Sequence, residues 1–149
     1  MTIGIASDHG GYELKEKLVR SLRENYQLND YGAHQFDAAD DYPDYVLPLA
    51  RAVASGEIER GIAICGSGVG ACMVANKIKG VRAALINETY SAHQGVEHDD
   101  MNILCIGARV VGETYAREII RTFLQARYSG EERHERRLNK LKQIEQSSS

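Results

Sequence analysis

Residues 61–70 read Gly-Ile-Ala-Ile-Cys-Gly-Ser-Gly-Val-Gly, an apolar run followed by alternating glycines. A continuously apolar run of this length is typical of a strand that is buried on both faces of a parallel sheet. The glycines permit a tight turn, and the segment 70–79 predicts a helix that ends at Gly80. This stretch therefore predicts a strand, a glycine loop and a helix in direct succession.

Short apolar runs and longer amphipathic runs alternate along the rest of the chain, in both directions from this stretch. Because the apolar runs are continuous, the strands are expected to form a parallel sheet with helices on both faces. The sequence thus predicts a single domain over residues 1–149, a three-layer α/β/α doubly wound (Rossmann-like) fold with a five-stranded parallel sheet. Strands are predicted at 3–6, 27–31, 61–65, 81–86 and 103–106, and helices at 14–22, 43–55, 70–79, 89–97, 115–126 and 131–146.

The charged tail helix at 131–146 carries only a thin apolar stripe, formed by Leu138, Leu141 and Ile144. Such a stripe is too narrow to anchor a helix in the core of its own domain. We therefore expect this C-terminal helix to pack on a partner subunit, and we expect residues 147–149 to be frayed.

The composition excludes several broad classes of protein. The chain has 149 residues and a net charge of −3, so nothing global points to nucleic acid or an anionic membrane as a partner. No run approaches the roughly 18 apolar residues of a membrane span, and the first residues do not resemble a signal peptide, so a cytoplasmic location is expected. Three cysteines without a Cys-x-x-Cys pair favour neither a disulfide framework nor a zinc site. No metal or cofactor is predicted.

Ligands of an open parallel sheet bind beyond the C-terminal ends of its strands. At these positions the sequence has Asp8 and His9 after the first strand, the loop 65–70 after the third and Arg109 after the fifth. A turn alone would need one glycine, whereas alternating glycines let backbone N–H groups converge on a phosphate or on the oxyanion of an enolised sugar. A helix N-terminus beside Cys65 favours its thiolate, which can act as a nucleophile or as a base.

Three classes of protein use a loop of this kind. A low-molecular-weight phosphatase is excluded, because Ala71 stands where its arginine is required. A dinucleotide-binding domain matches residues 66–71, with Glu88 as the ribose-binding acid, but its fingerprint normally follows the first strand. A single five-stranded sheet also lacks the second half of such a fold. The third class is a sugar-phosphate enzyme.

Cationic side chains late in the chain favour the third class. Arg133 and Arg137 are four residues apart and share one face of the tail helix, and paired guanidinium groups suit a phosphate dianion. Glutamates on the same helix offer them solvent-exposed ion pairs as an alternative. His98 is a candidate general acid–base group, but it precedes the fifth strand and so lies toward the sheet edge opposite Cys65. We therefore expect a homodimer or a tetramer with active sites shared between subunits.

Several separated motifs, in this order, resemble the B-type ribose-5-phosphate isomerases and the related galactose-6-phosphate and allose-6-phosphate isomerases. The resemblance covers nearly the whole chain and implies a metal-free aldose–ketose isomerase of a phosphorylated sugar, with ribose 5-phosphate as the first expectation. Isomerases of other aldose phosphates, with four or six carbons, are the close alternative, and a nucleotide-binding module is a more remote one. The motifs are residues 7–15, 41–44 (Asp-Tyr-Pro-Asp), 65–70, 75–77 (Ala-Asn-Lys), 80–83 (Gly-Val-Arg-Ala), 102–109 and 130–134 (Gly-Glu-Glu-Arg-His).

The resemblance also implies roles for single residues. Cys65 would be the base that moves a proton between C1 and C2 through a cis-enediolate, while Ser67 and the loop N–H groups stabilise the enediolate oxygen. His98, from the partner subunit, would help to open the furanose ring, with Asp8 nearby. The other positions carried over are the loop residues Gly66, Gly68, Val69 and Gly70, the pocket residue Tyr42, and the phosphate ligands His9, Arg109, Arg133 and Arg137.

One position departs from the pattern of these isomerases. The ribose-phosphate members carry His-Asn where this sequence has His98-Asp99. A carboxylate cannot donate a hydrogen bond to a sugar oxygen as an amide does. If Asp99 contacts the substrate, the change bears on which sugar is accepted.

Overall fold

The computed structural model describes residues 1–147 and confirms the predicted fold class. Five parallel strands form one sheet in the order β2-β1-β3-β5-β4. The strands are β1 (Thr2–Ser7), β2 (Gln27–Asp30), β3 (Arg60–Cys65), β4 (Ala83–Leu85) and β5 (Ile103–Gly107). The helices are α1 (Tyr12–Leu22), α2 (Pro43–Ser55), α3 (Val69–Ala75), α4 (Thr89–Asp99), α5 (Glu113–Gln125) and α6 (Glu132–Ser147).

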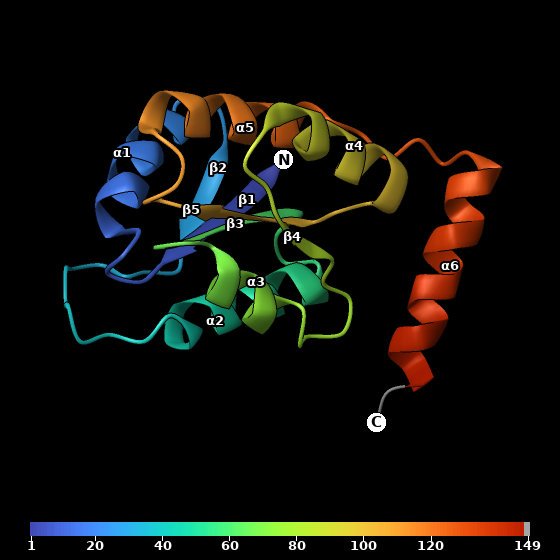
Figure 1. Cartoon of the computed structure of the whole chain (residues 1–149), viewed down its shortest axis with the longest axis horizontal. Coiled ribbons are helices and arrows are strands. Elements are labelled where there is room, and N and C mark those ends of the chain that lie inside the picture. The colour runs from blue at the N-terminus through green and yellow to red at the C-terminus, as the bar shows by residue number, and fades with distance from the viewer. Residues whose placement is uncertain (148–149) are drawn as a thin grey trace.

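Helices cover both faces of the sheet. α1, α4 and α5 lie on one face and α2 and α3 lie on the other, which gives the three layers that are visible in Figure 1. Every residue of β3 and β5 is buried. These two interior strands therefore have no solvent face, and this is why residues 61–65 and 103–107 carry no charged side chain. Arg60, the first residue of β3, is buried too, and its guanidinium group donates to the carbonyl oxygen of Ala126.

The order of the strands creates a crevice between β1 and β3. The chain passes from β1 to β2 on one side and then returns to the other side of β1 to form β3. At such a switch point the loops that follow the two strands diverge and leave a ligand site at the carboxyl edge. Ser7 and Ile64 are register partners near these strand ends, so the segments beginning at Asp8 and at Cys65 start side by side.

The helix predicted at 70–79 is shorter in the structure, where α3 ends at Ala75. The next residue, Asn76, uses its side-chain amide to pair with the backbone of Ala83 in both directions, at 2.9 Å each. Asn76 thus occupies the free edge of β4, and this contact competes with continuation of the helix. The predicted strand 81–86 shortens to Ala83–Leu85, partly because the Arg82 N–H donates to the Asn102 side chain instead of to a strand.

The tail helix α6 stands beside the three-layer body and packs chiefly on α4 (Figure 1). Leu138 is buried, whereas Leu141 and Ile144 are 46% and 65% exposed. Most of the apolar stripe is thus uncovered within one chain, and packing on a partner subunit remains a prediction. Ser147 belongs to α6, so the frayed end predicted from residue 147 is wrong at that residue, and residues 148–149 lie outside the described part of the chain. Within residues 1–147, no helix has the length and apolar character needed to cross a membrane.

Candidate active site

Three loops interlock at the carboxyl edge of the sheet, after β1, β3 and β5. The Arg109 N–H donates to the carbonyl oxygen of Gly66 at 3.0 Å, and the Ala108 N–H donates to that of Cys65 at 2.9 Å. A Cβ on Gly10 would stand 2.9 Å from the backbone nitrogen of Gly66. The glycines thus allow the backbones to approach closely, and the structure brings together the three segments that the sequence analysis selected.

The glycine loop between β3 and α3 takes its shape from Gly68. This residue has φ +81°, in the left-handed region, and a Cβ there would lie 2.5 Å from Leu85 Cδ1 and 2.9 Å from the backbone of Ile106. The Gly68 N–H donates to Cys65 Sγ at 3.1 Å. Cys65 is a free thiol and is 5% exposed. A backbone donor on sulfur stabilises negative charge there, as a thiolate base requires.

Tyr42 and Ser67 lie at the same loop. A Cβ on Gly70 would stand 2.6 Å from Tyr42 Cζ, so the phenol ring lies directly over the first turn of α3. Tyr42 is partly exposed, and Ser67 is exposed. Ser67 Oγ accepts a hydrogen bond from the Val69 N–H at 3.2 Å. Both side chains therefore lie at the glycine loop and reach solvent.

Asp8, His9 and Arg109 form the polar side of the crevice. Asp8 is buried, and its Oδ1 accepts from the Gly10 N–H at 2.9 Å. His9 Nδ1 lies 2.6 Å from Oδ1 of Asp40, which the sequence analysis did not select. The hydrogen bond to Asp40 raises the pKa of His9, and the charge of Asp8 acts in the same direction, against the opposing effects of burial and of Arg109. The polar side of the crevice thus combines a histidine whose pKa is raised with the guanidinium group of Arg109.

Among the described residues, one group of side chains has atoms close enough together to bind a metal ion. Asp8, His9 and Asp40 bring such atoms within 4.8 Å of one another. Oxygens of both carboxylates already accept hydrogen bonds from backbone N–H groups, and Asp40 also binds the His9 ring. We therefore interpret His9 and Asp40 as a hydrogen-bonded pair, with Asp8 bound to the loop backbone beside them.

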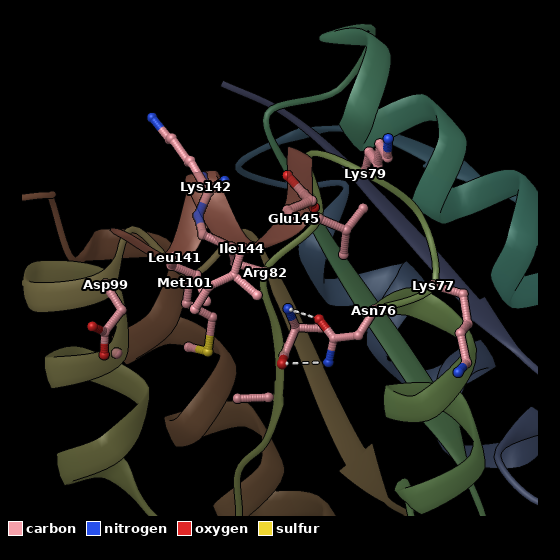
Figure 2. A pocket seen from close by; sticks show the side chains of 14 residues that line it. Asn76, Lys77, Lys79, Arg82, Asp99, Met101, Leu141, Lys142, Ile144 and Glu145 are labelled. Atoms are coloured by element: carbon pink, nitrogen blue, oxygen red, sulfur yellow. Dashed lines mark hydrogen bonds between the residues drawn. The ribbon is translucent and has the colours of Figure 1, made fainter. Parts of the chain in front are cut away.

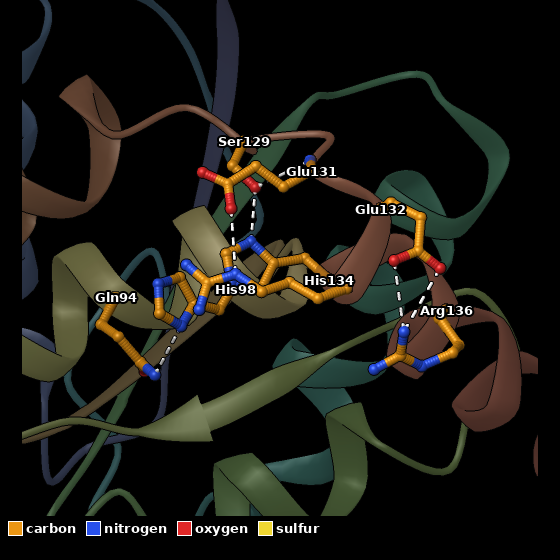
Figure 3. Close-up of polar contacts among 8 residues, drawn as sticks. Gln94, His98, Ser129, Glu131, Glu132, His134 and Arg136 are labelled. Atoms are coloured by element: carbon orange, nitrogen blue, oxygen red, sulfur yellow. Dashed lines mark hydrogen bonds and ion pairs between the residues drawn. The ribbon is translucent and has the colours of Figure 1, made fainter.

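His98 lies in a second polar cluster, at the other end of the sheet. α4 begins at Thr89, beyond the carboxyl end of β4, and its 11 residues carry the chain back by ~15 Å to His98. Within one chain, His98 and Cys65 therefore lie far apart. The sequence predicted this separation. The Gln94 side-chain amide donates to His98 Nδ1 at 3.1 Å, and the His98 ring stacks on that of His134 (Figure 3).

The tail-helix arginines lie near this second cluster and not near the glycine loop. Arg133 Nε donates to Glu131 Oε2 at 2.9 Å, so the alternative of an exposed ion pair is realised for this residue within one chain. Arg137 is exposed. Asp99 is also exposed and lines a cavity of about 870 Å³ between α6, α4 and β4 (Figure 2). That cavity is also lined by Leu141 and Ile144 and is separate from the glycine loop.

Glu88, the candidate ribose-binding acid of a dinucleotide site, has a different role in the structure. Its carboxylate accepts from the Ser91 N–H at 3.0 and 3.1 Å and caps the N-terminus of α4. Hydrogen bonding from the side chain and then the backbone of Ser91 lowers the pKa of Glu88. A carboxylate committed to a helix cap is not available to two ribose hydroxyls, so the structure argues against the dinucleotide alternative.

Asp40, Gln94, Ser129 and His134 were not selected from the sequence as site residues. His134 is buried, and its Nδ1 lies 2.5 Å from Ser129 Oγ. The sequence did offer a clue to His134, because a histidine beside Arg133, on a helix with few apolar residues, is a candidate for a polar contact. Asp40 gave no such signal, because its partner lies 31 residues earlier in the chain.

Together these features define a class of protein, a doubly wound α/β domain with a thiol and a glycine loop at its switch point. The family model for ribose/galactose isomerases matches residues 3–141, and the chain belongs to that family. It is therefore a member of a family of aldose–ketose isomerases, as the motifs indicated.

Solved structures and a characterised relative support this assignment. Ribose-5-phosphate isomerase B of Clostridium thermocellum is 46% identical, with a TM-score of 0.95 over 100% of both chains. The Mycoplasma genitalium ribose-5-phosphate isomerase B with bound ribulose-5-phosphate is 40% identical, with a TM-score of 0.93 over 99% of this chain and 97% of that one. D-erythrulose-4-phosphate isomerase of Pectobacterium atrosepticum is 36% identical over 87% of this chain and 86% of its own length. The family thus includes relatives named for five-carbon and for four-carbon sugar phosphates.

Proposed function

We propose that the protein interconverts ribose 5-phosphate and ribulose 5-phosphate by proton transfer through a cis-enediolate. The observation that carries the proposal is the position of Cys65 Sγ, which accepts the Gly68 N–H at the mouth of the glycine loop. A base and a set of oxyanion donors are thereby held within one turn of the chain. Enolisation needs both, because it removes a carbon-bound proton and places charge on an oxygen.

Each step has a group to perform it. The Cys65 thiolate takes the C2 proton of the open-chain aldose. The electron pair of the broken C–H bond forms a C1–C2 double bond, and the carbonyl electron pair moves onto O1. The same sulfur then returns the proton to C1, while the proton of the O2 hydroxyl passes to O1 and leaves a C2 carbonyl. Ser67 lies beside this path. Loop N–H groups stabilise the developing oxyanion, and preorganised donors of this type contribute about 10²–10³ in kcat.

Residues for the phosphate group come from two places. His9 and Arg109 lie at the carboxyl edge of the sheet, whereas Arg133 and Arg137 lie on α6 beside His98. A phosphate dianion suits a combination of guanidinium forks and an imidazolium. We propose that the α6 arginines and His98 complete the site of a second copy of the chain.

The proposed homodimer would also cover apolar surface that a single chain leaves exposed. Leu141 and Ile144 line the cavity between α6 and the edge of the sheet, together with Val81 and Met101 (Figure 2). α6 otherwise depends chiefly on α4 and on the Gly80 N–H, which donates to Glu145 Oε1 at 2.9 Å. A partner seated there would bury the apolar stripe.

A five-carbon substrate is favoured over a four-carbon one by the setting of His98. An aldose 4-phosphate with four carbons cannot close a furanose ring, because the hydroxyl that would close it carries the phosphate. It therefore needs no group for ring opening. In this chain the Gln94 amide donates to His98 Nδ1, which leaves Nε2 as the protonated nitrogen of the neutral ring. An oriented N–H donor suits a substrate whose ring oxygen must be protonated.

A panel of aldose phosphates with four, five and six carbons tests the proposal. We expect the highest kcat/KM with ribose 5-phosphate and a much lower value with erythrose 4-phosphate. A preference for the four-carbon sugar would support the second candidate, an erythrose-4-phosphate isomerase, and would contradict the argument from His98. Absence of turnover with every sugar phosphate, combined with a thermal shift on adding NAD, would favour a nucleotide-binding module.

A further inference from the structure

Asp40 is the residue that closes the long loop between β2 and α2 back onto the end of β1. Its Oδ1 accepts from the His9 backbone N–H at 2.9 Å and lies 2.6 Å from His9 Nδ1. The Asp40 side chain is 4% exposed and that of His9 is 30% exposed. One buried carboxylate thus holds both the backbone and the ring of a partly open histidine.

The contact fixes which ring nitrogen faces the crevice. An ionised carboxylate only accepts hydrogen bonds, so His9 Nδ1 must be the donor to Asp40. In a neutral ring, Nε2 would then carry a lone pair and would repel a phosphate oxygen. In the imidazolium, Nε2 carries a proton and can donate to that oxygen in a charge-assisted hydrogen bond.

The charges around His9 favour the imidazolium. Asp40 and Asp8 are the anionic groups that face the ring, and Arg109 is the cationic one. Phe36 adds an uncharged contact, with ring centroids 6.4 Å apart in an edge-to-face arrangement. The Asp40 hydrogen bond is the largest influence and raises the pKa of His9. His9 therefore keeps more of its charge at neutral pH than a solvent-exposed histidine does.

We propose that Asp40 is a positioning residue that holds His9 as an oriented cation for the phosphate group of the substrate. The inference rests on the proposed function, in which His9 binds that phosphate. Asp40 does not touch the ligand, because it lies on the Nδ1 side of the ring and is buried. Its negative charge is therefore turned away from the phosphate, while its hydrogen bond turns Nε2 toward it.

A role as a loop anchor alone would explain the backbone contact but not the ring contact. The variant Asp40→Asn separates the two, because an amide oxygen still accepts from the His9 N–H and the Nδ1–H but carries no charge. Binding of inorganic phosphate to the full-length protein, measured by calorimetry at pH 5.5 and pH 8, is the readout. The ratio of variant to wild-type Kd cancels the titration of phosphate itself.

We expect Asp40→Asn to bind phosphate about as tightly as the wild type at pH 5.5 and about tenfold more weakly at pH 8, where an ordinary histidine is neutral. His9→Gln should weaken binding at both pH values, and adding Asp40→Asn to it should cause no further loss. An equal loss at both pH values, or a further loss in the double variant, would show that Asp40 anchors only the loop.

A second measurement does not depend on the stability of the variant or on turnover. The imidazole of His9 can be followed by NMR in the wild-type protein, with His9→Gln to assign its signal. We expect a titration midpoint above the ordinary value of about 6.5, and a midpoint at or below that value would overturn the inference. Neither measurement uses a sugar phosphate, so a failure of the proposed isomerase activity would be seen separately in the sugar-phosphate panel.

Discussion

His98 and His134 stack their imidazole rings, with centroids 4.0 Å apart and planes 26° from parallel (Figure 3). The two rings come from α4 and α6, so the stack is part of the contact by which α6 packs on α4. Burial lowers the pKa of His134, and the positive charge of a protonated His98 acts in the same direction. A neutral His134 can therefore stack on His98 without bringing two cations face to face.

The depressed pKa of His134 predicts a pH-dependent contribution to stability. In the unfolded chain this histidine titrates near its ordinary value of about 6.5, whereas in the folded protein it titrates lower. Between these two values the unfolded state binds the extra proton, so stability is lost as the pH falls below about 6.5. Replacing His134 with phenylalanine removes this loss, and the Tm difference between variant and wild type should move in favour of the variant on going from pH 7.5 to pH 5.

A constant offset in Tm is expected for His134→Phe, because the contact with Ser129 is lost, so the slope against pH is the diagnostic quantity. His93→Gln serves as the control, since the His93 side chain is 55% exposed and forms an ion pair with Glu97 at the surface. Curves of Tm against pH that run parallel for wild type and His134→Phe would contradict the prediction.

Cys65→Ala should abolish turnover while leaving phosphate binding intact. Removal of a general base lowers kcat by typically 10²–10⁴-fold, and the phosphate ligands do not depend on the Cys65 side chain. Cys72→Ala is the matched control. A hydrogen bond with Cys105 lowers the pKa of Cys72 to about 7, which makes it the competing candidate for a reactive thiol. Turnover that survives Cys65→Ala and falls in Cys72→Ala would reverse the assignment of the base.

The apolar strand and glycine loop at residues 61–70 could be predicted from the sequence because their determinants are local. Continuous burial of β3 dictates apolar residues, and the close approach of Gly68 to β5 dictates glycine. The pairing of Asp40 with His9 depends instead on how a loop without periodicity closes across the sheet edge. The end of α3 at Ala75 depends likewise on an edge strand that comes later in the chain. Contacts between distant segments leave no trace in local spacing.

Gly68→Ala should disrupt the glycine loop, because the added Cβ causes a steric clash as well as the strain of a positive φ. Gly68 and Gly56 have nearly the same φ, +81° and +82°, but an added Cβ meets Leu85 and backbone atoms at Gly68 and nothing within 4 Å at Gly56. Gly56→Ala should therefore cost about 1–2 kcal/mol in stability and leave kcat unchanged. Gly68→Ala should lower kcat by at least about 10², the effect of losing an oxyanion donor. Equal kinetics for the two variants would show that the loop shape does not contribute to catalysis.

The separation of Cys65 from His98 within one chain predicts that two inactive variants can restore each other. Cys65→Ala and His98→Gln each damage every site of their own dimer. In a hybrid dimer, one shared site carries both lesions and the other carries none. Statistical mixing of the two chains by co-refolding should therefore recover about a quarter of wild-type activity in a twofold symmetric dimer.

Mixing Cys65→Ala with Gly68→Ala is the matched control, because both lesions lie in the same half of the site. In this hybrid each site keeps one lesion, and no activity should return. If Cys65 and His98 acted within one chain, the first mixture would behave like the control. Recovery in the first mixture and none in the second would therefore show that α4 of one chain supplies His98 to the glycine loop of another chain. A movement of α4 within its own chain could not produce this pattern, because Cys65 and His98 would then always come from the same chain.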